Sequence, residues 1–360
     1  MPTSSYTLIC SSSHLLQIEG DPAIRESTPE INMNKSQSND LLKAKQSVLI
    51  KSDAVEEGVA EVRGYDFNQG INFEKLFDSY GTTGIQATHM AMIIEEINKM
   101  ISERERVFLA DESIEPCFPY PIARKKKALT LFLGYTSNLV TSGLREIFRF
   151  LAQHNLVDCI VTSAGGVEED IIKCLKATYI GNFKMCGAKL REKGLNRAGN
   201  MLIPNDNYCA FEEWLMPILD ECLREQQIAI DPVCWTPSKL IHRLGKEISN
   251  EDSICYWAFK NNIPSWIRLD IVEDLRHINT MAVKSLKTGV IILGGGFVKH
   301  HINNANLMRN GSDYTVYINT GQEFDGSDSG AEPDEALVAD ATLVFPIIVA
   351  RTFAKRLHSR

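Results

Sequence analysis

GVIILGGGFVKHH, residues 289–301, joins a short apolar run to three consecutive glycines and then to Lys299, His300 and His301. A short apolar run that ends in glycine is typical of a buried strand, and the polar residues that follow begin a stretch with helical spacing. Glycines at such a turn let backbone amides approach a ligand without a Cβ in the way. The stretch therefore predicts a strand, a tight turn and a helix that together can hold a ligand.

The same alternation of strand and helix recurs along the chain. Strand-like runs occupy 129–136, 157–164, 289–293, 314–319 and 341–349, with a change to helix beyond Pro346 as an alternative for the last run. Helix-like stretches occupy 137–155, 165–175, 270–286 and 298–309. Alternation of this kind, with glycine at the strand ends, predicts an α/β fold on a mostly parallel sheet with flanking helices. Such sheets bind ligands at the carboxyl ends of their strands.

Composition divides the chain into two parts. Residues 1–45 are rich in Ser, Asn, Thr and Gln and poor in aromatics, which predicts an N-terminal extension that is mobile or loosely docked. No Pro/Ser-rich linker follows, so we expect residues 46–360 to form one α/β domain.

Charge and cysteine usage exclude several classes of function. The net charge of −8 argues against non-specific binding to nucleic acid or to acidic membranes, and no apolar stretch reaches the roughly 20 residues of a membrane span. The nine cysteines form no CxxC pair and several lie in apolar surroundings, so we expect buried thiols, no metal site and a cytoplasmic location.

Three strand ends carry small or polar residues where a ligand can approach: GYTSN (134–138), TSAGG (162–166) and LGGG (293–296). Helix N-termini after such turns favour anions such as pyrophosphate. None of the three matches the GxGxxG dinucleotide motif, and each alone is equally typical of an ordinary strand-to-helix turn. Together they favour a phosphate-bearing ligand.

Two acidic clusters favour a cationic ligand instead. Glu168, Glu169 and Asp170 open the helix after Gly166, and residues 323–335 hold six carboxylates. Favourable placement at a helix N-terminus and a solvated loop are the simpler explanations. Two such clusters in one domain also fit a polyamine pocket, because ammonium groups require paired carboxylates.

Seven longer stretches, spread over residues 62–353, are specific enough to indicate a relationship. They resemble those of deoxyhypusine synthases. The resemblance implies a Rossmann-like fold, a tetramer of dimers with sites at the dimer interface, and NAD-dependent oxidation of spermidine. It implies that the aminobutyl group then passes through an imine on an enzyme lysine to a lysine of the hypusine-containing translation factor. The stretches are GYDFNQGINFEKLFDSYGTTGIQATHM (64–90), FLGYTSNLVTSG (132–143), TSAGGVEEDIIKCL (162–175), GNMLIPNDNYCAFEEWLMPILD (199–220), WTPSKLIHRLGKEI (235–248), LGGGFVKHHINNANLMRNG (293–311) and EFDGSDSGAEPDEA (323–336).

The resemblance also implies roles for individual residues. The positions that match NAD-binding positions of the family are Ser137, Asn138, Thr141, Ser163, Ala164, Gly165, Gly295, Thr320, Gly321, Asp340 and Ala341. The positions that match spermidine-site positions are Glu168, Glu169, His300, Gly326, Ser327, Asp328 and Glu335.

Two departures from the family pattern bear on activity. Active members carry Ser-Trp-Gly-Lys shortly after Pro-Asp-Glu-Ala, and that lysine is the nucleophile. Here PDEA (333–336) runs directly into LVADATLVF, and the only lysine after Lys299 is Lys355. Active members also hold a long segment with Asp-Gly-Ser-Leu-Gly-Asp, whose place is taken here by NNIPSWIRLDIVEDL (261–275). The nucleophile and two binding carboxylates are absent, so no catalytic residue is assigned.

Three hypotheses follow. The first is a non-catalytic regulatory subunit, similar to the inactive paralog of kinetoplastid deoxyhypusine synthase, which forms a heterotetramer with a catalytic paralog, activates it allosterically and meets the translation factor only indirectly. The second is an active NAD-dependent synthase whose two gaps arise from a gene model or from splicing. The third is a binding module that senses NAD or polyamine without a catalytic partner.

Overall fold

The computed structural model describes residue 43 and residues 53–108, 117–118, 124–227, 232–266, 272–321 and 336–359. The chain divides into two units, residues 1–59 and 60–360. The predicted extension 1–45 lies outside the described residues except for Lys43, so the predicted boundary at 45/46 remains a prediction. The larger unit is described below.

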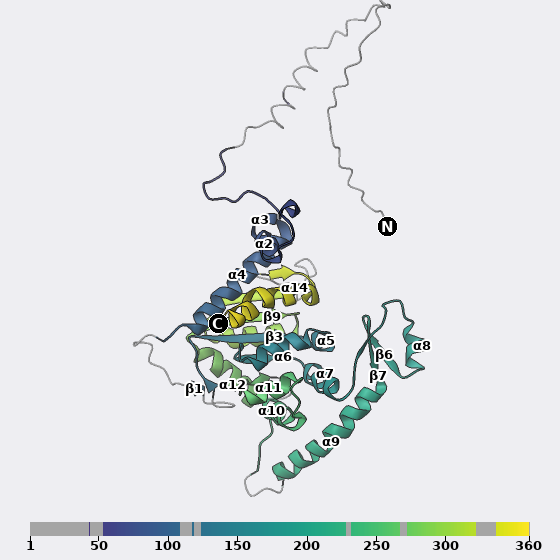
Figure 1. Ribbon diagram of the computed structural model, residues 1–360. Coiled ribbons are helices and arrows are strands. Elements are labelled where there is room, and N and C mark those ends of the chain that lie inside the picture. The colour runs from purple at the N-terminus through teal and green to yellow at the C-terminus, as the bar shows by residue number, and fades with distance from the viewer. Residues whose placement is uncertain are drawn as a thin grey trace, which may run out of the picture. The chain divides into compact units, whose positions relative to one another are not determined.

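A six-stranded sheet forms the centre of this unit, in the order β11-β10-β9-β3-β4-β8, and every neighbouring pair is parallel (Figure 1). The chain enters at β3 in the middle, adds β4 and β8 on one side, and then adds β9, β10 and β11 on the other. This is the strand order of the Rossmann fold. The predicted α/β class and parallel sheet are confirmed. The strands are β3 (Leu129–Tyr135), β4 (Cys159–Val161), β8 (Ser265–Trp266), β9 (Lys287–Leu293), β10 (Tyr314–Asn319) and β11 (Ala336–Val338).

Helices cover both faces of the sheet, and for this reason the central strands are apolar throughout. All seven residues of β3 are buried, as expected for a parallel strand between two layers. Leu131 and Leu133 point into the core under α4, α6 and α14, whereas Phe132 points into the core under α12 and α13. The helices are α4 (Ile85–Glu105), α5 (Ser137–Thr141), α6 (Arg145–Gln153), α7 (Ala164–Leu175), α10 (Pro237–Ile248), α11 (Ile254–Lys260), α12 (Val272–Val283), α13 (Phe297–Leu307) and α14 (Ala341–Val349).

A smaller antiparallel sheet stands apart from the main one. It has the order β5-β7-β6 and precedes the long helix α9, whose inner side packs against α7 and α10 (Figure 1). The sequence offered no strong periodicity here, and neither this sheet nor α9 was predicted. The elements are β5 (Tyr179–Ile180), α8 (Gly187–Arg191), β6 (Leu195–Ala198), β7 (Met201–Pro204) and α9 (Asn205–Gln227).

The remaining elements lie near the two ends of the unit and in one short hairpin. They are η1 (Phe67–Gln69), α2 (Phe73–Asp78), α3 (Tyr80–Thr83), β1 (Cys117–Phe118), β2 (Arg124–Lys125), the π-helix Ala350–Ala354 and α15 (Lys355–His358). The side chain of Arg351 pairs with Asp78, and Lys355 Nζ lies 3.1 Å from Glu74 Oε1, so ion pairs tie α2 to the C-terminal helix.

Two expectations about local structure were wrong. Residues 341–349 form a helix and not a strand, because Asp340 caps its N-terminus by accepting a hydrogen bond from Thr342 N. Thr342 is the one polar residue of this helix, and even Leu343, which is 72% exposed, is apolar, so no polar face marks the helical period and the composition resembles that of a strand. The single helix expected over 137–155 is broken between Thr141 and Arg145, where Ser142 Oγ donates to Leu139 O.

The expectation of buried thiols holds only in part. Of the eight described cysteines, three are buried and four are exposed, and none forms a disulfide. Among the described residues no helix is both long enough and apolar enough to cross a membrane.

Candidate functional site

The sheet changes its winding direction between β3 and β9. From β3 the chain crosses toward β4, whereas from β9 it crosses toward β10, so the loops after these two strands separate and leave a crevice. A cavity of about 240 Å³ lies at this point. Its walls are Thr136, Asn138, Leu139, Gly294, Gly295, Ile318, Asn319, Thr320, Gly321, Ala339, Asp340 and Ala341.

The strand ends that surround the cavity are held at one level by backbone hydrogen bonds. Thr136 N donates to Leu293 O at 3.3 Å, and Gly294 N donates to Ile318 O at 2.8 Å. Beyond these bonds the chains diverge. Thr136 Oγ1 donates to Asn138 Oδ1 at 2.6 Å, which orients the amide of Asn138 at the cavity wall.

The glycine triplet is required by close packing as well as by backbone conformation. Gly294 has φ +90°, and a Cβ at this position would lie 2.8 Å from Thr136 Cγ2. Gly296 has φ +63° and caps α13. Between them Gly295 lines the cavity at the N-terminus of an 11-residue helix. The free N–H groups of this helix end suit a phosphate, and the missing Cβ atoms let it come close.

Six of the residues that the resemblance assigned to NAD line this one cavity. They are Asn138, Gly295, Thr320, Gly321, Asp340 and Ala341. The other six wall residues were not predicted. Thr136 and Gly294 lie in two of the turns that the sequence analysis identified. Nothing in the sequence indicated that the ends of β10 and β11 lie beside these turns.

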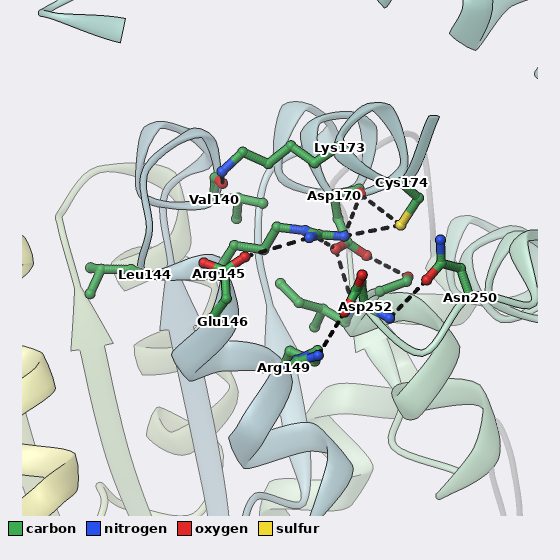
Figure 2. A network of polar contacts seen from close by, with 12 residues as sticks. Val140, Leu144, Arg145, Glu146, Arg149, Asp170, Lys173, Cys174, Asn250 and Asp252 are labelled. Carbon is green, nitrogen blue, oxygen red and sulfur yellow. Dashed lines mark hydrogen bonds and ion pairs between the residues drawn. The ribbon is translucent and has the colours of Figure 1, made fainter. Parts of the chain in front are cut away.

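The second predicted turn lies next to the first without lining the cavity. Gly165 packs closely against Ser137. A Cβ added at Gly165 would lie only 3.1 Å from Ser137 Cβ, so a larger residue would not fit without a shift. Lys173 Nζ donates to Val140 O at 3.1 Å (both residues are labelled in Figure 2). It also donates to Ser142 O at 2.9 Å. Lys173 therefore fixes α7 to the end of α5. The predicted residues Ser163 and Ala164 form the start of α7, and Thr141 is buried within α5.

The acidic cluster at the start of α7 separates into two roles. Asp170 is fully buried and belongs to the fold: its Oδ1 accepts from Arg145 Nε at 2.8 Å, and its Oδ2 accepts from Ser253 Oγ at 2.7 Å (Figure 2 shows the Arg145 contact). The backbone N–H groups of Ile254 and Cys255 also donate to this carboxylate. A carboxylate with four donors has no capacity left for a ligand.

Glu168 and Glu169 remain available. Burial raises the pKa of both carboxyl groups, and the neighbouring charge of Glu168 raises that of Glu169 further. Glu169 Oε2 is buried and has no hydrogen-bond partner among the described residues. The pKa of Tyr208, in the first turn of α9, is raised by burial and by the same two carboxylates. A partly dehydrated pair of carboxylates is a suitable acceptor for an ammonium group.

Of the remaining predicted spermidine-site residues, His300 alone falls within the described residues. His300 is exposed on α13. Gly326, Ser327, Asp328 and Glu335 lie outside the described residues. Within the described ranges, no group of three or more His, Cys, Asp or Glu could hold a metal ion.

Comparison with known proteins gives one family. The family model "Deoxyhypusine synthase" matches residues 75–267 and 265–352. A deoxyhypusine synthase of Caenorhabditis elegans is 56% identical, with 90% of this chain and 98% of the relative aligned. One of Brassica napus is 49% identical over 86% of this chain and 94% of the relative. A crystal structure assigned as a deoxyhypusine synthase, from Entamoeba histolytica, has 37% identity and a TM-score of 0.53 and covers 81% of this chain and 97% of that one.

The alignments also locate missing residues. The nematode alignment has 365 positions, yet 90% of 360 residues is about 324, so about 41 positions of the relative face gaps in this chain. The two stretches that match the family model meet at residues 265–267, where β8 ends. One of the two gaps inferred from the sequence therefore coincides with an interruption in the family match.

Proposed function

Because this chain belongs to the deoxyhypusine synthase family, we propose that its function is that of the family: NAD-dependent transfer of the aminobutyl group of spermidine to a lysine of the hypusine-containing translation factor. The observation that carries this proposal is the identity of 56% over 98% of the length of a relative that bears the name deoxyhypusine synthase. Identity of this extent across a whole chain favours a shared activity over a separate regulatory role.

The cavity at the switch point is suited to part of NAD. Gly295 and the N-terminus of α13 would hold a phosphate, while Asn138, Thr320 and Asp340 offer polar side chains to hydroxyl groups. When bound, NAD supplies the acceptor for the hydride that leaves the polyamine. Glu168 and Glu169 would bind the ammonium groups of that polyamine. Burial raises the pKa of both carboxyl groups because it destabilises their charged form, and a bound ammonium group would stabilise that form.

The nucleophile is the part that this chain does not supply. The family lysine follows Pro-Asp-Glu-Ala, and here residues 337–345 follow at once without a lysine. Lys299 is no substitute, because it is buried on α13 with its ammonium 4.7 Å from the ring of Tyr317. A nucleophile must be held within bonding reach of its substrate. We therefore propose that the form of this protein that turns over spermidine contains additional residues at both joins.

The test is to sequence transcripts across both joins and to express the short and long forms. We expect transcripts with in-frame additions after Trp266 and after Ala336. Borohydride trapping in the presence of spermidine and NAD should label a lysine in the long form and none in the 360-residue chain. If every transcript has the present length, this proposal fails.

One observation favours a regulatory subunit as the second candidate. Both joins lie beside the edge strands β8 and β11, and the four inner strands keep their parallel pairing without the missing residues. A chain of this length therefore retains the frame needed to associate with a catalytic paralog. The test is to add the purified chain to such a paralog from the same organism, because a regulatory subunit must raise its turnover.

A further inference from the structure

A second cavity, of about 550 Å³, lies along α10. Small-molecule sites have volumes of about 300–1,000 Å³, so this cavity is large enough for a ligand. It shares no wall residue with the cavity at the switch point, and neither Glu168 nor Glu169 belongs to its walls. It is therefore separate from the site described above. Its walls are Val233, Trp235, Ser238, Lys239, His242, Arg243, Lys246 and Phe259.

One face of α10 forms most of this cavity. Ser238, His242 and Lys246 follow one another at intervals of four residues, so they lie in one row along the helix. Lys239 and Arg243 each follow a member of this row by one position and widen it. The opposite face of α10 is buried in the apolar cluster that it shares with α7. The apolar face therefore fixes the helix to the fold, and the row of polar and aromatic side chains is left to the cavity.

Three aromatic rings line the cavity, and contacts within the fold hold each of them in place. Trp235 Nε1 donates to Cys222 O at 2.9 Å, which ties the segment before α10 to α9. The ring of His242 meets that of Phe259 edge to face, with the ring centroids 4.8 Å apart, and this contact joins α10 to α11. Since the rings are already ordered, a ligand that enters the cavity does not have to immobilise them.

The three cations of the walls differ in their partners. Lys239 Nζ lies 3.1 Å from Glu273 Oε1. Arg243 is held by two carboxylates: its Nη1 lies 2.9 Å from Glu225 Oε1, and its Nε lies 2.6 Å from an oxygen of a second glutamate. Lys246 is exposed and forms no ion pair with another described residue. It is therefore the cation of these walls whose charge no described carboxylate offsets.

Lys246 lies close to the aromatic part of the walls. Burial lowers the pKa of His242, and the ammonium group of Lys246, one helical turn away, lowers it further. Because this pKa lies below 6.5, the imidazole is neutral at pH 7 and acts as an aromatic wall rather than as a second cation. A neutral ring beside an ammonium group without a counter-ion is suited to an aromatic molecule that carries one negative charge.

We propose that this cavity binds a planar aromatic monoanion of the aromatic carboxylate class. The apolar body of the ligand would pack among the three rings, and its carboxylate would pair with Lys246. A polyanion is less suitable, because glutamates already hold the other two cations and would repel additional negative charge. The ammonium group of Lys246 likewise disfavours a cationic ligand. This site goes beyond the proposed function and does not depend on catalysis.

The test is isothermal titration of the 360-residue chain with three probes of one shape. They are 2-naphthoate, 2-naphthylmethanol and 2-naphthylmethylammonium, which are negative, neutral and positive. Excess NAD and spermidine are present throughout, so that the probes are kept from the two sites described above. We expect 2-naphthoate to bind once per chain with a dissociation constant below about 1 mM. The neutral probe should bind at least about threefold more weakly, and the cationic probe more weakly still.

Two substitutions separate the charge from the rings. Lys246→Glu should weaken 2-naphthoate about fivefold and leave the neutral probe unchanged, and since Lys246 is exposed the melting temperature should stay that of the parent. Trp235→Leu should weaken both probes alike. Lys189→Glu, an exposed change on α8 outside the cavity walls, is the matched control and should affect neither.

The proposal is overturned if 2-naphthoate does not bind, as would follow if another segment of the chain filled the cavity. It is equally overturned if the charge of the probe makes no difference, or if either substitution leaves the affinity for 2-naphthoate unchanged.

Discussion

Asp170→Asn is the substitution that tests most directly how the candidate site is supported. Asp170 lies on α7 and accepts from Arg145 on α6, as Figure 2 shows, and from Ser253 at the start of α11. It therefore joins the helix that carries Glu168 and Glu169 to two of its neighbours. Asparagine has nearly the same shape, so the change removes charge and acceptor capacity without leaving a cavity.

The loss of unfolding free energy expected for Asp170→Asn follows from the contacts of this carboxylate. Each carboxylate oxygen of Asp170 accepts from two donors, at distances of 2.7–3.1 Å. An amide nitrogen in place of either oxygen would face two donors. Arg145, whose side chain is 5% exposed, would lose its buried counter-ion and retain only Glu146 at 3.6 Å. Removing one partner of a buried ion pair costs about 3–5 kcal/mol. For a unit of this size, residues 60–360, that lowers the melting temperature by about 5–8 °C.

The assay is urea unfolding followed by circular dichroism, with Asp252→Asn as the control. Asp252 pairs with Arg149 at 2.8 Å in the same region, but its side chain is 70% exposed, so we expect a loss below about 1 kcal/mol. If Asp170→Asn also costs less than about 1 kcal/mol, the network does not support α7 as argued here.

Four further predictions concern the site and its pH dependence. Lys173→Met should weaken NAD binding about tenfold by isothermal titration while changing the melting temperature little, because it frees α5 from α7. Gly294→Val should cost about 1–3 kcal/mol and abolish NAD binding, since a side chain there is strained and meets Thr136; normal binding would contradict the packing. Spermidine binding should weaken as the pH falls toward 5, because the pKa of Glu169 is raised and this carboxylate therefore takes up a proton at a higher pH than an ordinary one. Glu169→Gln should remove part of this pH dependence. Burial lowers the pKa of His242 below the 6.5 of an unfolded histidine. The neutral imidazole therefore contributes stability above pH 6.5, and this contribution is lost as the pH falls through the lowered pKa of the folded protein. His242→Gln should reduce the loss of unfolding free energy on the acid side of the pH profile.

The central strands could be predicted from the sequence because each is a short apolar run that ends in a turn residue. Residues 314–319 became β10 with the same bounds, and the run before Gly294 became β9. Residues 341–349 were misassigned because the exposed side of this helix is apolar too, as Leu343 shows, so no polar face reveals its period. Length alone could not decide, since nine residues suit either element.

The candidate site was only half accessible to sequence reasoning. Each turn could be named from its glycines and hydroxyl groups, but sheet order decides which turns meet. The strand order places Thr136 beside Gly294, whereas Ser163, at the start of α7, is not among the residues that line the cavity. That Asp170 is bound within the fold while Glu169 is not depends on Arg145 and Ser253, which lie 25 and 83 residues away in the chain. No local pattern contains such information.

The sheet ends on either side in a very short strand, two residues in β8 and three in β11. Short margins offer little unpaired backbone to a foreign strand, and they contribute little to the core. Changes of length at these margins therefore alter what the protein can do far more than whether it folds. In such an architecture a gene can lose residues needed for catalysis while its product still folds stably, and selection can then act on that stable protein for a different function.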